Sequence, residues 1–294
     1  MTQLCSVCPR GCGVDRAGGQ FGFCAVPDAP VVARAAPHFG EEPCISGTRG
    51  SGAVFFSGCN LRCVFCQNRT ISRGEHGKEI TVAQLRGIFL RLRDAGVHNI
   101  NLVTPSHYTR QIAEALSGLE LGIPVVWNSS GYECVETLRM LDGLVQVYLP
   151  DLKYALSEPA ARYSAAADYP QVARAAILEM YRQTGPFWLD EDGMLQRGVL
   201  IRHLILPQQG ENTRRVIDWV GQTFAPGQVL FSLMSQYTPV GDLAQWPELQ
   251  RPISPELNEE MYQYLIDSPI TDGFYQDLDA ATGDMIPAFD GTGV

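Results

Sequence analysis

The chain has 294 residues, of which 45% are hydrophobic and 18% charged, a composition that excludes a disordered or fibrous protein. Its 22 basic and 32 acidic residues give a net charge of −10, which disfavours nonspecific binding to nucleic acid or anionic lipid. The N-terminus lacks the basic and apolar segments of a signal peptide, and no apolar run reaches the roughly 18 residues that span a bilayer. We therefore predict a soluble, cytoplasmic protein with no nucleic-acid or membrane partner.

The nine cysteines are unevenly distributed, since eight of them precede residue 67. An odd number of cysteines in a chain without a signal peptide argues against a disulfide framework and for thiolate ligands. The first group, Cys5, Cys8, Cys12 and Cys24, lies among many glycines and prolines, which predicts loops ordered by a bound metal. We assign residues 1–48 to a Cys-rich N-terminal extension.

From residue 50 the apolar pattern alternates between strands and amphipathic helices. Strands are predicted at 53–57, 99–103, 123–127, 144–149, 199–206 and 229–233, and helices at 81–95, 108–119, 135–141, 170–183, 212–223 and 255–267. Thr81 and Gln84 form a capping box, and Pro170 suits a first helical turn. Because the crossovers in such a chain are right-handed, we predict an α/β protein whose parallel sheet curls into a partial (βα)6 barrel over residues 49–250. A C-terminal helix and tail, 251–294, are expected to pack on it.

The second cysteine group, Cys59, Cys63 and Cys66, follows the first of these strands directly. This position is the carboxyl end of the strand, which is the catalytic face of a βα barrel. Three closely spaced thiolates suit a [4Fe–4S] cluster with one iron free of protein ligands, and an open coordination position is typical of metal sites that do chemistry. The alternative is a zinc knuckle or a ferredoxin-like cluster completed by a fourth cysteine, but the next thiol downstream is Cys134.

Cys59-x3-Cys63-x-Phe65-Cys66 at the end of the first strand resembles the motif of the radical S-adenosylmethionine (SAM) superfamily. The stretches 5–12, 42–52 and 148–154 resemble the PflX-type relatives of pyruvate formate-lyase-activating enzyme, over essentially the whole chain. The resemblance implies an oxygen-sensitive [4Fe–4S] cluster on the three cysteines, with SAM chelated at its open iron. One electron from a reductant such as flavodoxin or ferredoxin then gives methionine and a 5′-deoxyadenosyl radical.

The resemblance also implies an oxidoreductase whose radical abstracts hydrogen from a substrate, such as a glycine of a partner glycyl-radical enzyme. A radical SAM enzyme that modifies a peptide or a small molecule is the nearest alternative. A non-catalytic iron–sulfur electron carrier is a third hypothesis, which leaves the polar residues at the strand ends unexplained.

Polar residues follow the later strands, where the orienting groups of a barrel site are expected. Asp151 and Lys153 match an Asp-x-Lys pattern of the activases, and Arg202 matches an activase arginine suited to binding a carboxylate; a surface ion pair is the alternative for the first two. His203 is expected to be structural. The predicted cofactor-binding residues are Phe65, Gln67, Thr104, Asn128, Ser129, Asp151, Lys153 and Arg202.

Three positions depart from the activase pattern. Thr104-Pro105-Ser106 replaces a Gly-Gly-Glu segment, so that helix capping is as good an explanation for Thr104 as SAM binding. Asn128 replaces a carboxylate that belongs to a cation site in the activases, and Tyr237 falls where they carry a histidine that contacts SAM.

The first cysteine group has the spacing Cys-x2-Cys-x3-Cys-x11-Cys, which is enough for a closed four-thiolate site. A closed site favours structural zinc, structural iron–sulfur or electron relay, and ligand identity alone does not separate zinc from iron–sulfur. Cys44 either substitutes for one ligand or packs, and Cys134 is expected to be a small buried residue on a helix.

Overall fold

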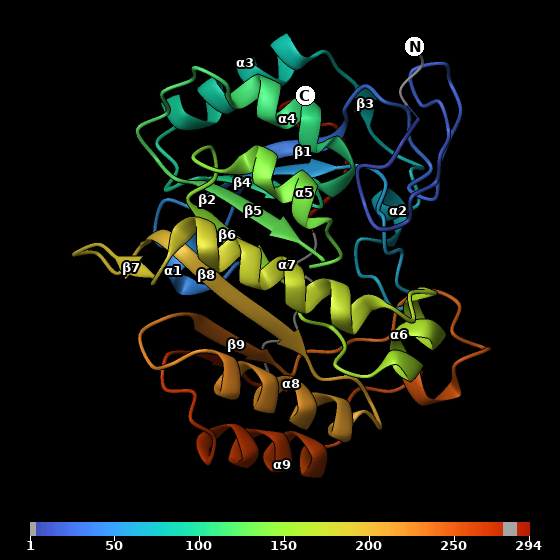
Figure 1. Cartoon of the computed structure of the whole chain (residues 1–294), viewed down its shortest axis with the longest axis vertical. Helices are drawn as coiled ribbons and strands as arrows, with labels where there is room; N and C mark the ends of the chain where they lie inside the picture. Colours follow the sequence, from blue (N-terminus) through green and yellow to red (C-terminus); the bar gives the residue numbers. More distant parts are fainter. Residues whose placement is uncertain (1–3, 279–286) are drawn as a thin grey trace.

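The computed structural model describes residues 4–278 and 287–294, and its centre is one largely parallel sheet (Figure 1). The strands are β1 (Val31–His38), β2 (Ser51–Phe56), β3 (Lys78–Glu79), β4 (Ile100–Val103), β5 (Val125–Ser129), β6 (Val147–Pro150), β7 (Trp188–Leu189), β8 (Leu195–Leu204), β9 (Leu230–Met234) and β10 (Gly273–Gln276). The helices are α1 (Pro43–Ser46), α2 (Arg69–Ser72), α3 (Val82–Asp94), α4 (Thr109–Leu116), α5 (Val135–Leu138), α6 (Ser157–Ser164), α7 (Tyr169–Thr184), α8 (Gly210–Thr223) and α9 (Pro255–Ile266).

The six strands predicted from the apolar runs are all present, as β2, β4, β5, β6, β8 and β9, and neighbours in that order pair in parallel. Every residue of β2, β4, β5 and β6 is buried, as expected for a parallel sheet that is covered on both faces. The prediction of a partial barrel is therefore confirmed.

The helices cover the outside of this sheet, with α3 and α4 over one part of it and α8 and α9 over another (Figure 1). Helix α3 buries Leu85, Ile88, Phe89 and Leu92, which lie three or four residues apart and so share one face. The capping box at its start is confirmed, because the side chain of Thr81 accepts from the Gln84 backbone and the Gln84 side chain accepts from the Thr81 backbone.

Two segments for which no strand was predicted contribute strands to the sheet. Residues 31–38 of the N-terminal extension form β1, which pairs antiparallel with β2. Residues 273–276 of the C-terminal tail form β10, which pairs in parallel with β9. Both strands depend on hydrogen bonds from a neighbouring strand, and their own sequences lack the apolar runs of the central strands.

The turn after β1 brings the chain back to the amino ends of the parallel strands, because β1 runs antiparallel to β2. There, Cys44 and Ile45 of α1 pack in one buried cluster with inward residues of β5, β6, β8 and β9. The Asn99 side chain donates to the Ile45 carbonyl at 2.7 Å. We call residues 40–46 the barrel floor. The loop that carries the first cysteine group, residues 5–24, lies at the opposite side, toward which the strand arrows point in Figure 1. We call it the Cys-rich loop.

In the described ranges, no helix has the length and apolar character needed to cross a membrane.

Candidate active site

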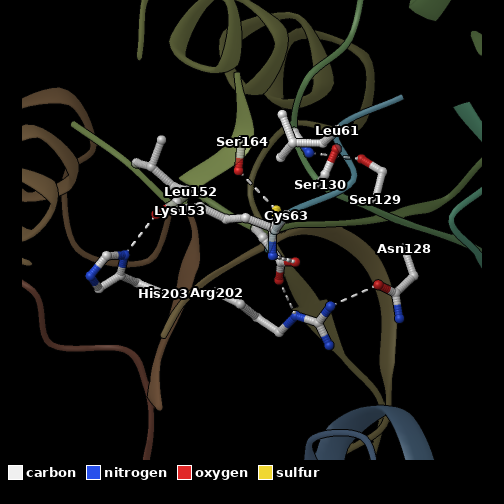
Figure 2. Close-up of polar contacts among 12 residues, drawn as sticks. Leu61, Cys63, Asn128, Ser129, Ser130, Leu152, Lys153, Ser164, Arg202 and His203 are labelled. Carbon is white, nitrogen blue, oxygen red and sulfur yellow. Dashed lines mark hydrogen bonds and ion pairs between the residues drawn. The ribbon is translucent and has the colours of Figure 1, made fainter. Parts of the chain in front are cut away.

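The second cysteine group lies in the loop after β2, and Cys59, Cys63 and Cys66 line one cavity at the carboxyl ends of the strands. The backbone N–H groups of Leu61 and Arg62 point at the Cys59 Sγ, at 3.3 and 3.4 Å. The hydroxyl of Ser164 donates to the Cys63 Sγ at 3.1 Å (Figure 2). Arg62 takes a left-handed conformation, with φ of 53°, which wraps the loop around the thiols.

Burial disfavours thiolates at this site unless a cation is present. It raises the pKa of Cys59 to about 12, although the Arg62 and Leu61 amides oppose the shift, and it raises the pKa of Cys63 as well. The neighbouring thiols add to both shifts. Two buried thiols and the partly buried thiol of Cys66 around one cavity therefore fit a group that supplies positive charge, such as iron, and that releases protons on binding.

The polar residues predicted at the strand ends meet in one network centred on Arg202. Its Nε donates to Asp151 Oδ1 at 3.0 Å, its Nη2 to Asn128 Oδ1 at 2.7 Å and its Nη1 to Glu41 Oε2 at 2.8 Å. The ammonium group of Lys153 donates to Asp151 Oδ2 at 2.6 Å. Figure 2 shows Lys153 beside Cys63, with Arg202 farther from the thiol. The alternative of a surface ion pair is wrong, because Asp151 and Lys153 are partly buried and line the cavity.

The charges in this network stabilise each other. Burial alone would raise the pKa of Asp151, but Lys153 and Arg202 outweigh it and hold the pKa below its usual range. Burial likewise opposes the charged form of Lys153, yet Asp151 and the Cys63 thiol raise its pKa. Lys153 and Arg202 therefore stay cationic and suit a carboxylate ligand.

The other predicted cofactor-binding residues line the same cavity: Phe65, Gln67, Thr104 and Ser129. Thr104 is unusual because it is a β-branched residue with φ of 59°, and such backbone strain concentrates at functional sites. Its N–H donates to the Asn128 carbonyl at 2.8 Å, which fixes the strained turn at the end of β4. Phe65 packs edge-on against Tyr163 and Tyr237.

Four further residues considered in the sequence analysis contact other parts of the fold instead of joining the three thiols. His203 is held between the Leu152 carbonyl and the Thr213 hydroxyl, and burial lowers its pKa to about 4. Tyr237 donates to the Leu249 carbonyl at 2.7 Å. Cys44 packs in the floor rather than with the other thiols. Cys134 precedes α5 as its N-cap and is only partly buried, which corrects its expected place inside a helix.

Glu41 and Glu42 are charged residues of the cavity that were not predicted from the sequence. Glu41 Oε1 accepts from Asn128 Nδ2 at 3.0 Å and from Asn101 Nδ2 at 3.1 Å, so Glu41 links the floor to three strands together with Arg202. Burial raises the pKa of Glu42, and Arg202 only partly offsets this. The available signal was the pair of adjacent acidic residues directly before Pro43, a residue suited to the start of a helix.

The first cysteine group forms one loop beside the cavity. The amide of Phe23 donates to Cys12 Sγ at 3.3 Å, and the thiols of Cys8 and Cys24 are buried. Burial raises the pKa of Cys8 to about 12, with the other three thiols adding to the shift. Across the described residues, no group of three or more His, Cys, Asp or Glu side chains is arranged around a single ion position. The metal assignments therefore rest on the motif, the shared cavity and the relatives.

Fold and site together define a partial-barrel protein with a thiol-lined cavity at the carboxyl ends of its strands. The sequence pattern of the radical SAM superfamily matches residues 53–162. The uncharacterized protein MJ0674 of Methanocaldococcus jannaschii is 30% identical over 262 residues, which cover 86% of this chain and 71% of that protein. The chain belongs to the radical SAM superfamily, and membership implies SAM and a [4Fe–4S] cluster.

Among solved structures, Streptococcus suis SuiB bound to S-adenosylmethionine is similar, with a TM-score of 0.50 and 16% identity. The match covers 79% of this chain and 51% of SuiB, so the chain spans about half the length of that structure. At this identity the likeness shows the fold alone, and it agrees with the partial barrel described above.

Proposed function

We propose that this protein reductively cleaves SAM at a [4Fe–4S] cluster held by Cys59, Cys63 and Cys66, and that the resulting radical removes hydrogen from a substrate. When bound, the cluster supplies the electron for this cleavage. The observation that carries the proposal is one cavity lined both by the three thiols and by the Asp151–Lys153–Arg202 network.

The side chains of the cavity have distinct roles in this proposal. Lys153, beside Cys63, binds the carboxylate of the methionyl moiety, and Asp151 holds Lys153 in place through its 2.6 Å ion pair. Phe65 and Gln67 pack near the adenine, while Thr104 and Ser129 offer polar groups from the ends of β4 and β5. The buried walls exclude water, which protects a reactive radical from side reactions.

For the substrate, we propose first a glycine of a partner glycyl-radical enzyme, with flavodoxin or ferredoxin as reductant. The Asp-x-Lys pair and Arg202, which match the activases, support this. A peptide or small-molecule substrate is the second candidate. It is favoured by Asn128, which replaces the activase carboxylate and is engaged by Arg202 and Glu41. Nine free thiols also support a cytoplasmic location, where thiols stay reduced.

The test is formation of 5′-deoxyadenosine from SAM by anaerobically reconstituted protein with a strong reductant. We expect product from the wild type, a fall to background for Cys63→Ala, and wild-type behaviour for the control Cys134→Ala, whose thiol lies outside the cavity. A protein that holds its cluster but binds no SAM would refute the radical function and favour an electron carrier.

We also propose that Cys5, Cys8, Cys12 and Cys24 hold a second iron–sulfur cluster or zinc. Their mutual proximity in one loop supports this site. The metal that remains in Cys63→Ala protein reports on it, because that variant has lost a ligand of the barrel cluster. Iron and zinc per chain, measured together, identify the metal, and a metal-free Cys63→Ala protein would contradict the second site.

A further inference from the structure

The floor of the cavity contains a carboxyl group that forms no hydrogen bond of normal geometry within the described part of the chain. Glu42 is only 1% exposed, yet neither of its carboxyl oxygens has a hydrogen-bond partner among the described residues. The nearest cationic atom, Arg202 Nη1, is 3.9 Å away and already donates to Glu41. A buried polar group without a partner is costly, so such a group in a cavity wall points to a ligand.

A second acceptor in the same cavity is without a partner among the described residues. Gln236 also lines the cavity, and because its amide nitrogen donates to Gln276, its Oε1 is a buried acceptor with no partner in residues 4–278 and 287–294. The Ser232 hydroxyl faces the Glu42 carboxyl and lowers the pKa of that carboxyl, but the two groups do not meet in a hydrogen bond of normal geometry. A ligand that satisfies the carboxyl of Glu42 or the amide oxygen of Gln236 must therefore present hydrogen-bond donors.

The charges around the floor also favour a cationic ligand. Burial raises the pKa of Glu42, so a bound cation would favour its ionised form. With Glu41, Glu42 and Asp151 all ionised beside the two cations Arg202 and Lys153, one negative charge is in excess. A single cationic group at the floor would balance that charge.

We propose that the floor binds an ammonium or guanidinium group of the substrate, with Glu42 as its anionic partner. This inference rests on the proposed function, in which SAM is held at the thiol end of the cavity. Figure 2 shows Arg202 on the far side of Lys153 from Cys63, toward the blue ribbon of the floor. The cation at Glu42 therefore belongs to the second ligand, and Glu42 is a specificity-determining residue for it.

The experiment measures the affinity of simple probes for anaerobically reconstituted protein with SAM bound, by equilibrium dialysis. The free-amine arm uses n-butylammonium and n-butylguanidinium, compared with n-butanol and butyrate. The peptide arm uses an acetylated Gly-Lys-Gly amide, compared with the same peptide carrying norleucine for lysine. We expect the cationic member of at least one arm to bind about tenfold or more tighter than its comparators, because a charged hydrogen bond is formed. The arm that responds identifies the source of the cation.

Glu42→Gln should abolish this preference, and Glu42→Asp should keep it. Glu42→Gln is expected to fold, because it removes an unpaired buried charge without changing the shape of the side chain. The matched control is Glu133→Gln, since Glu133 is equally buried but is bound by Ser106 and Trp127 outside the cavity lining. This control should bind the probes as the wild type does.

Two results would overturn the inference: butyrate binding as tightly as n-butylammonium, or an unchanged preference in Glu42→Gln. A loss of SAM affinity in Glu42→Gln that matches the loss for the cations would assign the residue to SAM instead. If 5′-deoxyadenosine never forms but the cations still bind through Glu42, the radical function fails and the cation site stands.

Discussion

Arg202 is the residue on which most of the polar network depends. Its guanidinium group satisfies Glu41, Asp151 and Asn128 through three separate nitrogens. Arg202→Ala would leave the mostly buried Glu41 without its counter-charge and Asp151 with Lys153 alone, and breaking a buried ion pair from one side is strongly destabilising. We expect the free energy of unfolding to fall by about 3 kcal/mol, measured by denaturant titration without SAM.

The control for Arg202→Ala is Arg215→Ala, which removes an exposed arginine paired with Glu211 one helical turn away. Exposed pairs of this kind contribute little, so this variant should unfold with the wild type. Equal stability of Arg202→Ala and the wild type would show that the network is not an energetic unit of the fold.

The network also shows what the sequence predicts at the scale of single residues. Asp151, Lys153 and Arg202 were predictable because each lies within or just after an apolar strand, and the carboxyl ends of parallel strands converge. The contact of Glu41 with Arg202 was not predictable, because Glu41 lies 161 residues away in the sequence and precedes the predicted strands. Only the antiparallel course of β1 brings it beneath the cavity.

At the scale of elements, the loop after β2 depends on the glycine that opens it. Gly58 has φ of 83°, and an added Cβ would lie 2.7 Å from both the Cys24 carbonyl oxygen and a Val26 methyl group. Gly58→Ala therefore combines a strained backbone with a collision against the N-terminal loop. We expect lower stability, faster proteolysis within residues 5–24 and less iron per chain after reconstitution.

Gly143→Ala separates these two effects. Gly143 has nearly the same φ, 79°, but no described atom lies within 4 Å of an added Cβ. It should therefore show only the backbone cost, about 1–2 kcal/mol, with iron binding unchanged. Matching iron content in the two variants would mean that contact with the N-terminal loop does not matter to the cluster loop.

The elements themselves differ in how far the sequence determines them. The central strands and the α3 cap were predictable because apolar runs and a capping box act locally. β1, with the sequence Val-Val-Ala-Arg-Ala-Ala-Pro-His, has no strict alternation, and β10 has four residues beginning with glycine. They are strands because they pair with β2 and β9, and such contacts between distant segments cannot be predicted from a local sequence pattern.

At the scale of the whole molecule, the floor lies at the amino ends of the strands, and the Cys-rich loop, residues 5–24, covers the cluster loop at their carboxyl ends. Arg10 holds this cover in place. Its guanidinium donates to the carbonyls of Asn60, Ser164 and Ala165, at 2.8, 2.8 and 2.6 Å, and lies 3.8 Å from the Phe23 ring centre. One side chain thus joins the Cys-rich loop, the cluster loop and the end of α6.

We expect Arg10→Ala to loosen the cover without unfolding the barrel, because local regions open independently of the core. Amide hydrogen exchange in residues 5–24 and 59–66 should accelerate about tenfold or more, since several hydrogen bonds to an ionised group are lost together. The cluster should also be lost faster in air. Arg86→Ala is the matched control, because Arg86 also donates to several carbonyls, including those of Ser117 and Gly118, but at the far end of α4. Its effect should be confined to that region, and unchanged exchange of 59–66 in Arg10→Ala would show that the N-terminal loop does not guard the cluster.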